Sequence, residues 1–217
     1  MSSDPRAGVP SQATDQLASP DAELTLAAQA LARGQVLLDG LERHLPGSRR
    51  HADGTASYAF ASAVELGADR ARAELVREAA RLHDVGKVYV PAAVLARRGE
   101  ELDARERALM DSHPAYGAAL AIGAGVPDAA CEWIGAAGER FDGAGGHGLA
   151  GADIPREARI IRVACACDGV LSRRPASAQA LPWIASAELR AAVGRELDPR
   201  AVEAMAAVLE RAARPTG

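Results

Sequence analysis

Apolar residues recur at three- and four-residue steps along most of this chain, for example in "DAELTLAAQALARGQVLLDGLERHL" from Asp21 to Leu45. That spacing places apolar side chains on one face of an α-helix. Nowhere do β-branched residues alternate with polar ones over the length of a strand. The sequence therefore predicts an all-α fold.

Glycine, proline and capping residues divide this pattern into separate helices. Pro20 suits the first turn of the first helix, Gly67 ends the second, and Asp69 caps the third. We expect helices over residues 20–45, 48–66, 69–86, 92–98, 104–111, 114–123, 128–137, 155–173, 186–194 and 199–213.

Two segments fall outside the helical pattern. Residues 1–19 offer almost nothing to bury, so we expect a disordered N-terminal tail ahead of one helical domain over residues 20–213. The connection 138–154, "GERFDGAGGHGLAGADI", contains six glycines. Loops of this length inside compact domains are often functional.

Composition excludes several classes of protein. A net charge of −4 and 3% aromatic residues argue against binding to nucleic-acid polymers or membrane surfaces. No apolar run approaches the roughly 20 residues that span a bilayer, and no secretory signal is present, so we expect a cytoplasmic protein. The cysteines Cys131, Cys165 and Cys167 form no C-x-x-C pair and are expected to be reduced, buried thiols.

The segment "RLHDVGK", residues 81–87, groups three residues that suit phosphate chemistry. His83-Asp84 alone is a weak motif, because such a pair arises often by chance. Lys87 adds to it, since it is the only lysine of the chain and a compact ammonium suits contact with a phosphate oxygen. The structural alternative is that a lysine after Gly86 complements the end of a helix.

Further motifs surround this segment in a definite order. His51 precedes "HDVGK" and Val90-Pro91, after which come "HPAYGAAL", "GERFDGAGG", "GLAGADIPREARI", "CDGVLSRRP" and "LDPRAVEAM". Over residues 45–200 this order resembles the HD-GYP family, a branch of the HD-domain metal-dependent phosphohydrolases. The resemblance implies an HD-domain-like helical bundle, a centre of two or three metal ions, commonly iron or manganese, and hydrolysis of cyclic di-GMP.

The resemblance also implies roles for single residues. The metal ligands would be His51, His83, Asp84 and His113. Lys87 would meet the phosphate and act with Asp84 in catalysis, and Arg140 and Asp142 would join Lys87 in contacting substrate. Taken singly, His51 or His113 would more often be an ordinary histidine, and His113 before Pro114 would equally suit the start of a helix. His44 lies outside the motifs and is expected at the surface.

The chain departs from the family at several ligand positions. Ala137 and Gly138 stand where the family has two adjacent histidine ligands, and Gly47 stands where some members have a glutamate. Cys165 replaces an aspartate ligand, which exchanges a hard oxygen donor for a soft sulfur. Asp168, three residues on, shares a helix face with Cys165 and is a candidate substitute.

The Gly-Tyr-Pro signature is also absent. Gly145, Gly146 and His147 occupy its place, in a loop one residue shorter than in the family. The family loop contacts substrate and docks diguanylate cyclase domains, and because its signature residues are replaced here, the resemblance by itself does not extend either property to this chain. We expect His147 to be an exposed polar residue of the loop.

These observations predict a single divalent ion, Fe, Mn or Zn, held by His51, His83 and Asp84 and completed by Cys165, Asp168 or water. The first functional hypothesis is a degenerate regulatory or binding module. Its ligands would be cyclic di-GMP or a related nucleotide and a protein signalling partner. The alternative is an active phosphodiesterase with a single-metal or rebuilt site.

Overall fold

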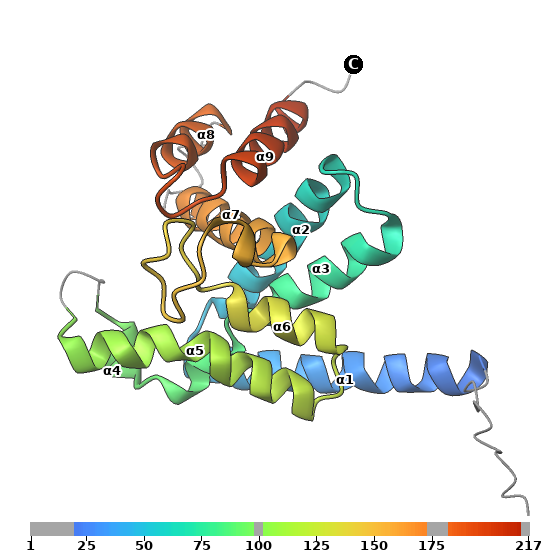
Figure 1. Ribbon diagram of the computed structural model, residues 1–217. Coiled ribbons are helices and arrows are strands. Elements are labelled where there is room, and N and C mark those ends of the chain that lie inside the picture. The colour runs from blue at the N-terminus through green and yellow to red at the C-terminus, as the bar shows by residue number, and fades with distance from the viewer. Residues whose placement is uncertain (1–19, 98–101, 173–181, 214–217) are drawn as a thin grey trace, which may run out of the picture.

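The computed structural model describes residues 20–97, 102–172 and 182–213, with side chains from residue 32 onward (Figure 1). These ranges are helical and contain no strand; Val193 and Leu197 form an isolated bridge. The predicted all-α fold is therefore confirmed. The predicted tail, residues 1–19, lies outside the described residues.

The helices follow the predicted order, and most begin and end within a turn of the predicted bounds. They are α1 (Pro20–His44), α2 (Ser48–Glu65), α3 (Arg70–Leu82), the 3-10 helix η1 (Val85–Tyr89), α4 (Ala92–Leu95), α5 (Ala104–Gly123), α6 (Asp128–Ala136), the 3-10 helix η3 (Gly151–Asp153), α7 (Arg156–Ser172), α8 (Pro182–Ala191) and α9 (Pro199–Ala212). None of these helices is long and apolar enough to cross a bilayer.

The prediction of two helices over residues 104–111 and 114–123 is wrong, because α5 runs unbroken through Pro114. Proline lacks the N–H that would bond the carbonyl four residues earlier, here that of Met110. The ring of His113 takes that place, with Nδ1 at 2.5 Å from the Met110 oxygen. His113 therefore lies inside a continuous helix rather than capping a new one.

The third helix ends earlier than predicted. Asp69 caps α3 as expected, accepting from the backbone N–H of Arg72 at 2.8 Å, but α3 stops at Leu82 instead of near Gly86. The chain then turns through His83 and Asp84 into η1. The His-Asp pair thus sits on the turn that joins two helices.

Small residues let α2 lie close to its neighbours. Its alanines at 52, 56, 59 and 63 are buried and recur on one face. The face packs against α3 and α7, which α2 contacts along its length. In Figure 1 these helices occupy the middle of the molecule, with α1 and α5 along one side and α8 and α9 on the other.

A close approach of backbones brings η1 against α5. A Cβ atom on Gly86 would lie 1.9 Å from the carbonyl oxygen of His113 and 2.5 Å from the nitrogen of Gly117. Only glycine fits there, so Gly86 allows the turn that carries Asp84 to reach His113.

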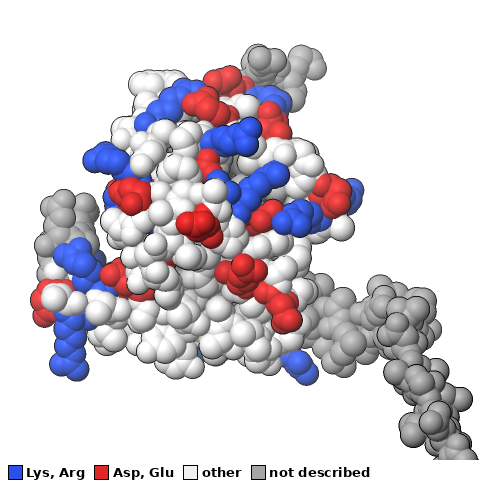
Figure 2. All heavy atoms as spheres, viewed as in Figure 1, with Lys and Arg blue, Asp and Glu red and all other residues white. Residues whose placement is uncertain are grey.

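Charged residues are mixed on the surface. On the face that Figure 2 shows, Lys and Arg alternate with Asp and Glu over the upper helices, without a continuous basic stripe. This mixture agrees with the small negative net charge.

Candidate metal centre

Side chains from four helices and one turn meet in the middle of the fold. The cluster contains His51 from α2, His83 and Asp84 from the turn after α3, Lys87 from η1, His113 from α5, and Cys165 and Asp168 from α7. These are residues that the motifs single out, and the structure brings them together.

The Asp84 carboxylate lies at the centre of the cluster and is 5% exposed. Its Oδ1 is 3.3 Å from Nε2 of His83 and 3.3 Å from Nε2 of His113. Its Oδ2 accepts a hydrogen bond from Nζ of Lys87 at 2.6 Å and lies 3.8 Å from Nε2 of His51. One oxygen is thus held by the lysine, while the other faces two imidazoles.

Two of the imidazoles are oriented by carbonyl oxygens of their own helices. Nδ1 of His83 is 2.7 Å from the Ala80 oxygen, and Nδ1 of His113 is 2.5 Å from the Met110 oxygen. A carbonyl oxygen can only accept, so each Nδ1 carries the proton. Such outer hydrogen bonds are typical of histidines that bind metal through Nε2.

The third imidazole is oriented by α7. Nδ1 of His51 is 2.6 Å from Oδ2 of Asp168, which also accepts from the Ser172 hydroxyl at 3.2 Å. Gly54 makes room for this carboxylate, because a Cβ atom there would lie 2.1 Å from Oδ1 of Asp168. In this structure Asp168 contacts His51 from the side of Nδ1, as a positioning group.

With Nδ1 protonated on His83 and on His113, the remaining ring nitrogen of each, Nε2, faces the Asp84 carboxylate. Burial lowers the pKa of His83, but the charges of Asp84 and Cys165 raise it overall, which favours a proton on this nitrogen. A cation between the nitrogen and the carboxylate would serve the same purpose. Nε2 of His83 is buried and has no hydrogen-bond partner among the described residues. A buried polar atom without a partner is costly, so the site requires an added proton or metal ion.

The charges of the cluster shift its pKa values. Burial by itself would raise the pKa of Asp84, but His83 and Lys87 hold it well below its usual range. Burial lowers the pKa of His51, whereas the hydrogen bond to Asp168 raises it, to about 10. The carboxylate is therefore ionised and available as a ligand over the whole neutral range.

Cys165 lies beside the same imidazoles. Its Sγ is 3.6 Å from Nε2 of His51, and the donor atoms of His51, His83 and Cys165 all lie within 4.8 Å of one another. Burial raises the pKa of this thiol, but His83 and His51 lower it to about 6. Burial instead raises the pKa of Cys167, to about 12, so only Cys165 is a thiolate near neutral pH.

The two missing histidine positions lie at the edge of the cluster. Ala137 and Cys165 together line a pocket of about 330 Å³ between α7, α8 and the segment before α9. Gly138 faces Pro114 instead, and a Cβ atom on it would lie 2.7 Å from the proline Cγ. Neither residue has a side-chain donor to offer a second ion.

The glycine-rich connection is organised by Glu139, which the sequence analysis did not single out. The Glu139 side chain is 1% exposed and accepts from the backbone N–H of His147 at 2.7 Å and of Leu149 at 3.2 Å. Its Oε1 is also 2.9 Å from Nδ1 of His147. The sequence held no local signal for this role, because the partners lie eight and ten residues further along the chain.

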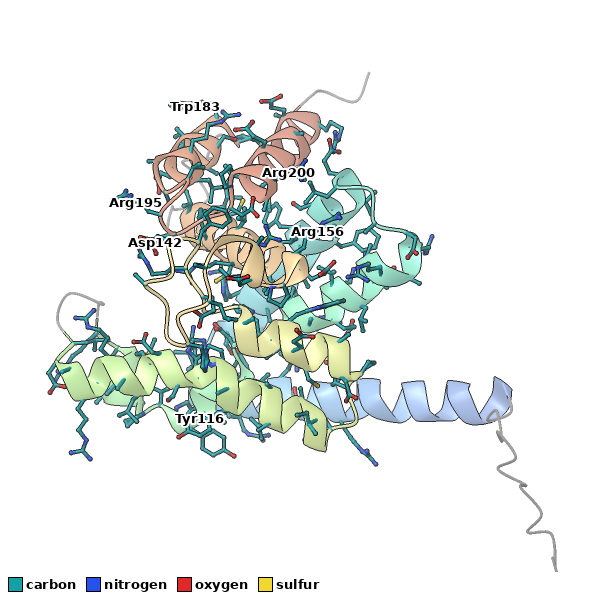
Figure 3. All side chains as sticks on the ribbon, viewed as in Figure 1. Tyr116, Asp142, Arg156, Trp183, Arg195 and Arg200 are labelled. Atoms are coloured by element: carbon teal, nitrogen blue, oxygen red, sulfur yellow. The ribbon has the colours of Figure 1, made fainter. Side chains whose placement is uncertain are left out.

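Arg140 and Asp142 pair with each other rather than with the cluster. Arg140 donates to Asp142 at 2.7 and 3.0 Å and lies 3.2 Å from Glu196. Figure 3 places Asp142 near Arg195 at the outer edge of the molecule, where its N–H bonds the Arg195 carbonyl at 2.8 Å. Among the described residues, no contact joins this pair to the histidines, so its substrate role stays a prediction.

His44 is half-buried rather than simply exposed. Its Nε2 lies 2.8 Å from the Val90 carbonyl oxygen, which ties the end of α1 to the end of η1. The expectation of a surface residue was wrong because the contact partner lies 46 positions away.

The residues present fit one divalent transition metal ion. Three Nε2 or Sγ donors converge, each imidazole is held through Nδ1, and the buried Nε2 of His83 lacks any other partner among the described residues. Imidazole, thiolate and carboxylate together suit iron, manganese or zinc to different degrees.

Comparison with known proteins identifies a family for this chain. The family model described as "HD domain" matches residues 35–201. The chain is 38% identical over 149 residues to a protein named cyclic di-GMP phosphodiesterase response regulator RpfG from Xanthomonas campestris, covering 66% of this chain and 38% of that protein. It is 33% identical over 159 residues to the 3'3'-cGAMP-specific phosphodiesterase 2 of Vibrio cholerae, covering 70% of this chain and 30% of that protein. The chain thus spans well under half the length of these relatives.

Solved structures show the same fold. Bd1817, an HDG"Y"P protein from Bdellovibrio bacteriovorus, superposes with a TM-score of 0.64 and 18% identity over 88% of this chain and 66% of its own. The PgpH HD domain of L. monocytogenes in complex with cyclic-di-AMP superposes with a TM-score of 0.56 and 17% identity over 81% of this chain and 94% of its own. At these identities the likeness establishes the helical fold.

Proposed function

The chain belongs to the HD-domain family, and on that basis we propose that it is a single-metal member that binds a cyclic dinucleotide or related nucleotide as a regulatory module, without useful hydrolysis. The observation that carries the proposal is the contrast between the residues that still offer metal donors and the residues that offer none. His51, His83 and Asp84 converge, whereas Ala137 and Gly138 present no donor.

The retained side supplies what anion binding requires. His51, His83 and Asp84 would hold the ion, with Cys165 or water beside it. When bound, a divalent ion supplies positive charge that attracts a phosphodiester oxygen. Lys87 adds a second positive group. The ion pair with Asp84 holds its ammonium beside the site, and 19% of the side chain remains exposed.

The missing side removes what hydrolysis requires. Two-metal phosphodiesterases stabilise the attacking and the leaving oxygen with separate ions. A second ion here would have His113 and a share of Asp84 as donors, and the Ala137 methyl and Gly138 add none. The ligand would therefore bind with its phosphodiester near Lys87 and remain intact.

The names of the relatives supply the class of ligand. RpfG is named as a cyclic di-GMP phosphodiesterase, the Vibrio relative as specific for 3'3'-cGAMP, and the PgpH domain is described in complex with cyclic-di-AMP. A cyclic dinucleotide is accordingly the first ligand to test. A protein signalling partner would read the bound state, as expected of a module without output chemistry of its own.

One observation favours the alternative of a surviving phosphodiesterase. The pocket of about 330 Å³ opens beside Cys165, so solvent and a substrate group have access to the edge of the cluster. A substrate could reach a single-metal or rebuilt site through this opening. Analysis of the nucleotide recovered after incubation distinguishes the two functions, because a binding module leaves it intact and a phosphodiesterase does not.

The test measures metal, binding and product on the same full-length sample. Protein loaded with Zn²⁺ or Mn²⁺ is titrated with cyclic di-GMP and 3'3'-cGAMP by calorimetry, and the recovered nucleotide is separated by chromatography. We expect one ion per chain, saturable binding and intact nucleotide.

His83→Ala should lose both metal and binding, while His147→Ala, which alters a histidine bonded to Glu139 on the loop, should keep its metal. Linear dinucleotide formed over many turnovers, or no binding by the loaded protein, would overturn the proposal.

A further inference from the structure

We infer that Cys165 binds the ion directly as a thiolate, which makes this centre selective for zinc over manganese and weakens it as a hydrolytic site. The inference rests on the proposed single-metal function and specifies its cofactor. It concerns a residue that replaces an aspartate ligand of the family.

The donor distances match those that a tetrahedral ion imposes. Zinc bonds of about 2.3 Å to sulfur and about 2.0–2.1 Å to nitrogen or oxygen place S and N about 3.6 Å apart and N and O about 3.3 Å apart. Sγ of Cys165 is 3.6 Å from Nε2 of His51, and Nε2 of His83 is 3.3 Å from Oδ1 of Asp84. These two pairs therefore stand at ligand spacing, while the donor atoms of His51, His83 and Cys165 lie within 4.8 Å of one another and would draw together around an ion.

A second observation points to a ligand independently of the cysteine. Nε2 of His83 is buried and makes no hydrogen bond among the described residues, although it lies 3.3 Å from Oδ1 of Asp84 and the ring is oriented by the Ala80 carbonyl. The Nε2 of His51 and the Sγ of Cys165 lie within 4.8 Å of it. An ion bonded to all three would satisfy the buried nitrogen.

Sulfur changes which ion binds. Thiolates favour zinc and other soft or borderline ions, whereas manganese and magnesium favour oxygen donors. The thiolate also carries a full negative charge, which adds to that of Asp84 and reduces the positive charge that the ion presents. The reduced charge would still attract a phosphodiester oxygen but would polarise it less, which agrees with binding that is not followed by hydrolysis.

The position of Cys165 on α7 makes the assignment specific. Cys167 lies two residues further along the same helix and is fully buried in the apolar core. Residues two apart point in different directions on a helix, so Cys167 faces away from the cluster. It provides a matched control for any effect of losing a thiol from α7.

Cobalt substitution provides the test, because Co²⁺ replaces zinc and reports its ligands by absorption. Metal-free full-length protein titrated with Co²⁺ should develop the near-ultraviolet charge-transfer band of a cobalt–thiolate bond. Cys165→Ser should lose that band and bind zinc about 100-fold or more weakly, whereas Cys167→Ser should keep both. Cys165→Asp should bind manganese better than the parent and reduce its preference for zinc.

The outcomes distinguish this inference from the function on which it rests. A cobalt spectrum without the sulfur band, or parental zinc affinity in Cys165→Ser, would overturn thiolate ligation while leaving the single-metal module intact. If the parent binds no ion and behaves like His83→Ala, both proposals fall. Should Cys165→Ser not fold, X-ray absorption at the zinc edge of the unmodified protein reveals whether a sulfur neighbour is present.

Discussion

Asp168 lies against the far side of His51, with Oδ2 at 2.6 Å from Nδ1, so two residues 117 positions apart form one hydrogen-bonded pair. The carboxylate orients the ring so that Nε2 points toward Cys165 and Asp84. Asp168, which the sequence suggests as a substitute ligand, thus orients the His51 ring in this structure.

Asp168→Asn should weaken metal binding about 10- to 100-fold, as expected when a partner that orients a metal-binding histidine is lost. The measurement is competition with a chelator of known affinity. Ser172→Ala is the control, since its hydroxyl bonds the same Oδ2 at 3.2 Å without touching His51, and it should have a much smaller effect. Unchanged affinity in Asp168→Asn would show that His51 is held by other contacts.

Gly54→Ala should destabilise the protein by about 1–3 kcal/mol and weaken metal binding, because the new methyl group collides with the Asp168 carboxylate. Gly40→Ala is the matched substitution, since Gly40 lies inside α1 with nothing within 4 Å of an added Cβ. It should raise stability by roughly 0.5–1 kcal/mol, the usual gain in a helix. Thermal unfolding of both variants measures the two changes in stability. Equal changes would mean that the Asp168 side chain moves aside without cost.

Much of this arrangement was predictable because it is local. Helical spacing and caps predicted most helix bounds, and the motif order predicted that His51, His83, Asp84 and His113 cluster. The exceptions involve contacts between distant parts of the chain. No spacing rule reveals that Gly54 makes room for the Asp168 carboxylate, or that the end of α1 meets the Val90 carbonyl through His44.

The structure does not test the substrate residues. Family register alone suggests Arg140 and Asp142 as substrate contacts, and in the folded chain each pairs with the other. This pairing of opposite charges two residues apart is a local contact. Their substrate role therefore stays a prediction.

Alkylation of the metal-free protein should distinguish its thiols by pH. Burial raises the pKa of Cys165 but His83 and His51 bring it to about 6, below the ordinary 9.0, so the reactive thiolate predominates above about pH 6. The rate of iodoacetamide modification should rise through pH 6 and level off before pH 9. Cys167, with a pKa raised by burial to about 12, should stay unmodified.

Peptide mass spectrometry identifies the modified cysteine in that experiment. Zinc added before the reagent should protect Cys165, since a coordinated sulfur is no longer free to attack. A midpoint near pH 9, or equal labelling of Cys167, would contradict the charge arrangement around Cys165.

Lys87→Met should reduce nucleotide binding by about tenfold or more and lower the stability of the metal-free protein. The methionine keeps the apolar stem but leaves the buried Asp84 oxygen without its 2.6 Å partner, at a cost of about 1–3 kcal/mol. Zinc should recover part of that loss by neutralising Asp84.

Arg195→Gln, on the surface near Asp142, is the comparison and should change neither nucleotide binding nor stability. Nucleotide binding equal to the parent's would return Lys87 to a structural role.

Rebuilding the site tests whether absent donors alone prevent hydrolysis. Ala137→His with Cys165→Asp adds an imidazole and a carboxylate at the wall of the same pocket, where about 330 Å³ is open. We expect metal content to rise from one ion to two and manganese to replace zinc as the preferred ion, with phosphodiesterase activity gained as the second ion binds.

Adding Gly138→His should then lower the melting temperature, because its Cβ would lie 2.7 Å from Cγ of Pro114 and the ring must shift. Metal analysis, product analysis and thermal unfolding are measured on the same samples. Two ions without activity would assign the remaining defect to the altered loop at Gly145–His147, and one ion in the double variant would show that donors at these positions are not what the second site lacks.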